Sequence, residues 1–172
     1  MNKKKLKMKC MEIPTGTCPN LLIHDIILME GESDKLVDFW KTKVGGELEL
    51  IPLTDRAGLY INKKGHQEEL ALNKVATCLT ERYVQDFVAG EKYIVGTAML
   101  IGLAEGPELI AAPVEVMYDA LRVCRMIRET IDAGKISGIG SEKWQEAMAT
   151  LVNVIAEKGE SSSDLEGSFE WN

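Results

Sequence analysis

The chain has 172 residues, 45% of them hydrophobic and 27% charged, a balance typical of a folded globular domain and not of a disordered chain. A chain of this length can bury a full core within one domain and needs no disulfide or metal to hold it together. The net charge of −7 argues against a surface that embraces nucleic acid as a whole, because such binding depends on lysines and arginines that neutralise phosphates.

The first elements in chain order are a basic segment and a strand. Residues 1–12 are rich in lysine and poor in apolar anchors, so their composition predicts a flexible basic arm. The run 21–29 is rich in leucine and isoleucine and follows turn residues, which predicts a largely buried strand. The lysines of the arm are Lys3, Lys4, Lys5, Lys7 and Lys9.

A helix and a hairpin come next. Ser33 is a favourable cap for a helix that runs to Val44, because apolar residues recur there at helical spacing and Gly45 supplies a stop. Residues 47–62 contain two short strands joined by a turn, and Pro52 places this hairpin at the edge of a sheet.

The second half of the chain predicts further helices around one strand. Residues 68–88 fit a helix or a strand, and the helix is favoured. Residues 92–103 predict a buried strand, and Pro113 opens a helix that ends at Gly134. Ser141 can cap a last helix that Gly159 closes.

These elements predict an α+β fold in which a small mixed or antiparallel sheet packs against three to four helices. A single domain is expected from residue 13 to residue 159, between the basic arm and a disordered acidic tail at 160–172. The longest apolar run is interrupted by Gly96 and Gly102 and is shorter than the roughly 20 residues of a membrane helix, so we expect no transmembrane span. Four widely spaced cysteines without a CxxC pair are typical of thiols in a reducing compartment, which favours a cytoplasmic location.

Signatures of catalysis are missing from the sequence. There is no Walker loop, GxGxxG, GxSxG or HExxH motif, and neither histidine has neighbours at metal-ligand spacing. His24 is expected to be a hydrogen-bonded strand residue, and His66 an exposed turn residue. We therefore expect no enzyme, cofactor or metal, although Cys78 or Cys124 would be the candidate nucleophile of an enzyme of unrecognised family.

Contact residues are predicted at both ends of the sequence. The lysine cluster attracts anionic lipid, RNA or an acidic partner. Acids three residues after Ser161 and Ser163 favour phosphorylation of both serines, which would add negative charge. Aromatic side chains supply much of the energy of binding hot spots, which predicts a partner-binding tail that comprises Leu165, Phe169 and Trp171.

The basic segment, the strand 21–29 followed at once by the helix 33–44, and the later strand 92–103 together resemble the layout of rhabdovirus matrix proteins, in particular the shorter plant-infecting members. The resemblance implies a self-associating structural protein of virion and host cytoplasm that bridges nucleoprotein and anionic membrane through its basic arm. The family's PPxY motif is absent from this sequence.

Three functions are thus predicted, in order of preference. The first is a non-enzymatic assembly protein of the matrix type that forms homo-oligomers. The second is a small regulatory adaptor that binds a protein partner through its acidic aromatic tail. The third is the cysteine-dependent enzyme.

Overall fold

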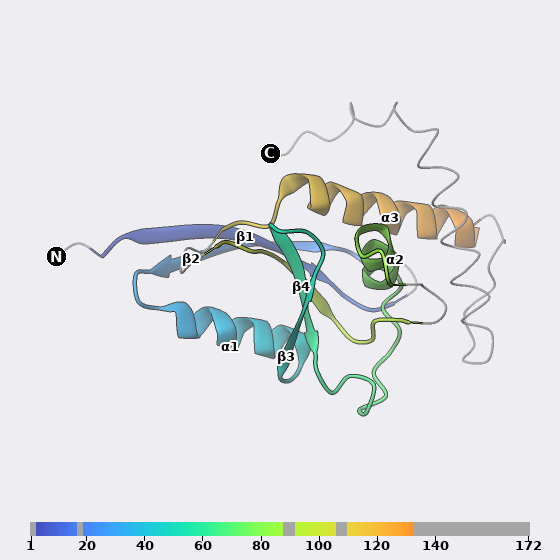
Figure 1. The fold of residues 1–172 in the computed structure, drawn as a ribbon, viewed down its shortest axis with the longest axis horizontal. Helices are drawn as coiled ribbons and strands as arrows, with labels where there is room; N and C mark the ends of the chain where they lie inside the picture. The colour runs from blue at the N-terminus through green and yellow to red at the C-terminus, as the bar shows by residue number, and fades with distance from the viewer. Residues whose placement is uncertain (1–2, 17–18, 88–91, 106–109, 133–172) are drawn as a thin grey trace.

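The computed structural model describes residues 3–16, 19–87, 92–105 and 110–132. Over these residues the chain forms a five-stranded antiparallel sheet in the order β2-β1-β5-β4-β3, with helices on both faces (Figure 1). This confirms the α+β class and the antiparallel form of the sheet. The described elements are β1 (Lys5–Ile13), β2 (Leu22–Met29), α1 (Ser33–Val44), β3 (Leu48–Pro52), β4 (Ala57–Asn62), α2 (Lys74–Tyr83), β5 (Ala98–Gly102) and α3 (Val114–Asp132).

Strand β1 occupies most of the segment whose composition predicts a flexible arm. It lies between β2 and β5, so residues 5–12 belong to the fold and are not an arm. The physical reason is that lysines alternate with apolar residues, so a strand here directs its apolar side chains to one face. On that face Met8 and Cys10 are buried, at 4% and 0% exposure. The folded part of the chain therefore begins before residue 13.

The sheet separates two hydrophobic cores because successive side chains of a strand point to opposite faces. On one face, Met99 and Ile101 of β5 pack with Leu36 and Trp40 of α1. On the other face, Leu100 belongs to a larger core to which α2 and α3 contribute. Both faces of the central strand are thus buried.

Strand β2 is an edge strand within the described residues, whereas its apolar composition predicts a largely buried one. Leu22, Ile27 and Met29 are 46%, 52% and 39% exposed. An apolar run does not distinguish a central strand from an edge strand, because that depends on which strands pair with it.

The predictions for α1 and the hairpin are confirmed in outline. Helix α1 has the expected bounds and ends at Gly45, whose φ of +79° is the left-handed conformation that favours glycine. Ser33 is not its cap: the N-cap residue is Glu32, which makes no side-chain capping bond. Strand β3 ends at Pro52 and forms the second edge of the sheet, as expected.

The second half of the chain differs from its prediction in one place. The helix favoured within 68–88 is confirmed as α2. The strand expected over 92–103 is regular only as β5, because Gly96 has a φ of +76° and breaks the extended run. The helix after Pro113 is confirmed as α3, while the predicted helix at 141–159 and the tail at 160–172 lie outside the described residues. No helix in the described ranges is long and apolar enough to span a membrane.

Candidate functional site

The candidate site is the ribbon formed by β1 and β2, and its first feature is the outer edge of β2. The N–H of Glu30 donates to the carbonyl of Lys4 at 3.0 Å, so even-numbered residues of β2 bond to β1. The odd-numbered residues therefore point their N–H and C=O groups away from β1. The outward N–H of Met29 donates to Glu32 Oε2 at 3.0 Å. The outward N–H groups without a partner among the described residues are those of Ile23, Asp25 and Ile27.

The second feature is the face of the ribbon that carries the lysines. Residues directly opposite in an antiparallel pair share a face, and Lys5, Lys7 and Lys9 oppose Met29, Ile27 and Asp25 respectively. Lys9 pairs with Asp25 at 3.3 Å, with both side chains largely exposed. Lys5 and Lys7 have no ion-pair partner within the described ranges. The N-terminal half of β1 extends beyond the end of α3, so this basic and apolar face is uncovered by that helix (Figure 1).

The opposite face of the ribbon carries a small charged cluster against α1. Glu12 Oε2 lies 2.6 Å from His24 Nε2 and 3.2 Å from Lys43 Nζ, and the Glu12 side chain is 14% exposed. The ring of His24 meets Phe39 edge-on, with 5.4 Å between ring centroids. The prediction of a hydrogen-bonded strand histidine is thus confirmed. His66 is exposed, as its turn position predicts.

The three described cysteines are buried thiols that form no disulfide with one another. Desolvation by burial raises the pKa of Cys10 to about 11 and the pKa of Cys78 to about 12. A catalytic cysteine needs the opposite shift, because the thiolate is the nucleophile. Cys124 Sγ hydrogen-bonds to the carbonyl oxygen of Pro19 at 3.4 Å. No group of three or more metal-ligating side chains gathers in the described part of the chain.

The structure brings only part of the predicted contact residues together. Lys5, Lys7 and Lys9 share one face of β1, and Lys3 and Lys4 precede that strand. The other predicted contact residues lie outside the described residues: Ser161, Ser163, Leu165, Phe169 and Trp171.

Two apolar members of the ribbon were not predicted from the sequence. Ile27 and Met29 lie beside the lysines on the exposed face, although their strand reads as a buried one. The signal that the prediction of an arm overlooked is the alternation of lysine with apolar residues in β1, because a half-buried strand has this period of two.

Comparisons with protein-family models, with curated proteins and with solved structures find no match for this chain. The resemblance to rhabdovirus matrix proteins therefore stays a prediction from the sequence.

Proposed function

We propose that this chain is a non-enzymatic assembly protein, matrix-like in its role, whose copies self-associate by pairing their β2 edges. The observation that carries the proposal is the run of outward backbone groups at Ile23, Asp25 and Ile27 on an eight-residue edge strand. A long edge strand with apolar side chains is a template for another strand, since its backbone donors and acceptors still have to be satisfied.

Pairing of two β2 edges would also join the basic faces of two copies. Two identical strands that pair antiparallel are related by a twofold axis perpendicular to the sheet, and this rotation keeps like faces on the same side. The lysine faces would then form one continuous surface. We propose that this surface contacts an anionic membrane. Ile27 and Met29 lie beside the lysines, and such apolar side chains fit the apolar boundary of a lipid surface better than they fit a nucleoprotein.

The first test replaces the last residue of this outward run. Ile27→Pro removes one outward N–H and no bond to β1, so we expect a folded monomer where the unmodified chain forms dimers as concentration rises. Leu50→Pro on β3 is the matched control. The N–H of Lys63 donates to the carbonyl of Glu47, so Leu50 also directs its N–H outward, and it is 40% exposed.

Analytical ultracentrifugation measures the mass of each protein over a concentration series, and circular dichroism verifies that each is folded. The Leu50→Pro protein should dimerise as the unmodified chain does. Dimers of folded Ile27→Pro protein, or loss of dimers only in Leu50→Pro, would contradict pairing through β2.

The second test concerns the lysine face. A lysine near an anionic membrane contributes about 1 kcal/mol, so the double substitution Lys5→Gln/Lys7→Gln should weaken vesicle binding roughly 30-fold. Co-sedimentation with vesicles of phosphatidylcholine and phosphatidylserine measures this, and added salt should weaken binding of the unmodified chain. Lys63→Gln/Lys64→Gln removes two exposed lysines of a turn and should bind normally. If both double variants lost vesicle binding equally, the binding would depend on overall charge and not on the lysine face. Deleting residues 1–9 is unsuitable, because it removes half of β1.

A further inference from the structure

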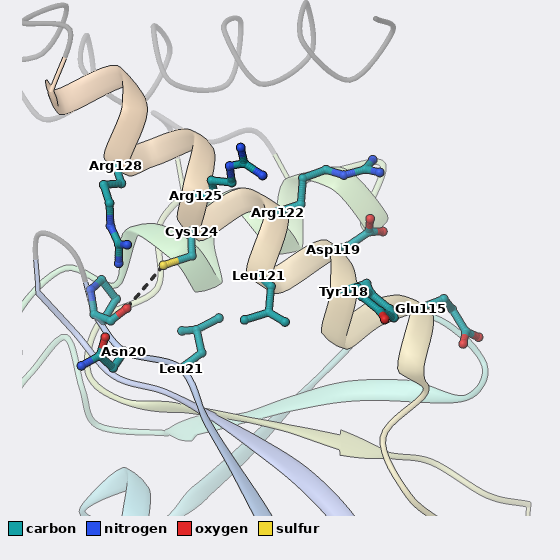
Figure 2. Close-up of a pocket in the computed structure, with 11 residues that line it drawn as sticks. Asn20, Leu21, Glu115, Tyr118, Asp119, Leu121, Arg122, Cys124, Arg125 and Arg128 are labelled. Carbon is teal, nitrogen blue, oxygen red and sulfur yellow. Dashed lines mark hydrogen bonds between the residues drawn. The ribbon is translucent and has the colours of Figure 1, made fainter. Parts of the chain in front are cut away.

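A groove of about 790 Å³ runs between α3 and the segment that leads into β2. Leu121 of α3 and Leu21, which precedes β2, face each other across it in Figure 2, and both also pack against the larger core. The hydrogen bond from Cys124 Sγ to the carbonyl of Pro19 ties the helix to this segment. The groove therefore has an apolar floor between two joined parts of the chain.

One end of the groove carries an excess of positive charge. Arg122, Arg125 and Arg128 recur at every third position of α3, where like charges repel one another. Arg125 Nε lies 3.1 Å from Glu129 Oε1, whereas Arg122 and Arg128 have no ion-pair partner within the residues that the structure describes. Arg128 extends from the helix toward Asn20 across the groove (Figure 2).

Asp119, toward the other end of the groove, is engaged by other residues. Asp119 accepts a hydrogen bond from the Tyr83 hydroxyl and another from Arg82 Nε, at 3.2 Å, so its charge is used locally. Burial, and then the hydrogen bond to Asp119, raise the pKa of Tyr83, which keeps that hydroxyl protonated as a donor. The arginine end thus remains a site for an anion.

We infer that the groove binds a single-chain amphipathic anion, with a phosphate or carboxylate head at Arg128 and its apolar chain on Leu21 and Leu121. A guanidinium group can pair with either a phosphate or a carboxylate in a bidentate geometry, and the adjacent apolar floor suits a hydrocarbon chain. The volume lies in the range of small-molecule sites, which is roughly 300–1,000 Å³. This ligand site goes beyond the proposed assembly function and does not depend on it.

Isothermal titration of the full chain with decyl phosphate, below the concentration at which it forms micelles, tests the inference. Saturable binding is expected, and inorganic phosphate and uncharged decyl maltoside should each bind weaker by about tenfold or more, because each offers only half of the ligand. Arg128→Gln should weaken decyl phosphate binding by about tenfold or more. Arg56→Gln, which removes an exposed arginine of the β3–β4 turn, should leave it unchanged.

Several outcomes would overturn this site. They are the absence of saturable binding, equal binding of inorganic phosphate, equal binding of decyl maltoside, and normal binding by the folded arginine variant. A vesicle arm distinguishes the source of the head group: binding to phosphatidate in vesicles without binding to monomeric decyl phosphate would overturn the single-chain ligand. The Ile27→Pro protein should bind decyl phosphate as the unmodified chain does, so failure of the assembly proposal is distinguishable from failure of this one.

Discussion

Replacing Asn73 with alanine is expected to destabilise the fold by about 3 kcal/mol. Asn73 is fully buried, and its Oδ1 caps α2 by accepting the N–H of Ala76 at 3.0 Å. Its Nδ2 donates to the carbonyls of Ile13 and Gly96, each at 2.8 Å. The alanine variant loses the cap, which is worth about 1 kcal/mol, and the two buried hydrogen bonds from Nδ2, at about 1 kcal/mol each. One side chain thus holds the end of β1, the loop before β5 and the start of α2 together.

Denaturant unfolding followed by tryptophan fluorescence measures this loss as a lower midpoint. Gln67→Ala removes an exposed amide side chain from a turn and is the control, with an expected change within about 0.5 kcal/mol. A loss below about 1 kcal/mol for Asn73→Ala would show that the three hydrogen bonds do not hold these segments together.

Gly102→Ala is expected to destabilise the fold by about 3 kcal/mol or more. A β-carbon at this position would lie 2.4 Å from the carbonyl oxygen of Ala111 and 2.5 Å from that of Ile110. Both are backbone atoms, so the connection that leads into α3 would have to move. The hydrogen bond from Ala112 N–H to the carbonyl of Lys9, at 2.8 Å, holds that connection against β1 and would be strained as well.

Gly31→Ala provides the contrast. Gly31 has a φ of +92° but no atom within 4 Å of the added carbon, so the cost is only that of the left-handed backbone, about 1 kcal/mol. Thermal unfolding of both variants, monitored by circular dichroism, compares the two costs. Equal destabilisation would mean that the close approach at Gly102 relaxes without loss.

The candidate site was predictable only in part. The lysines of β1 stand out in the sequence as a cluster of charge, but composition alone assigns them to an arm. The lysines alternate with Leu6, Met8 and Cys10, and this period of two is typical of a strand. The segment joins the sheet because the alternation gives β1 one apolar face to bury. The outward N–H groups of β2 depend on the register with β1, which no local pattern records.

The sequence by itself determined the elements whose signals are local. The helical spacing and Gly45 specify α1, Pro52 marks an edge strand, and Pro113 precedes α3, because each acts through the conformation of its own segment. Only the tertiary structure decided which strands pair, which apolar residues stay exposed, and how α3 and residues 19–21 form a groove. Those properties arise from contacts between segments far apart in the chain, and a residue's neighbours in sequence do not specify them.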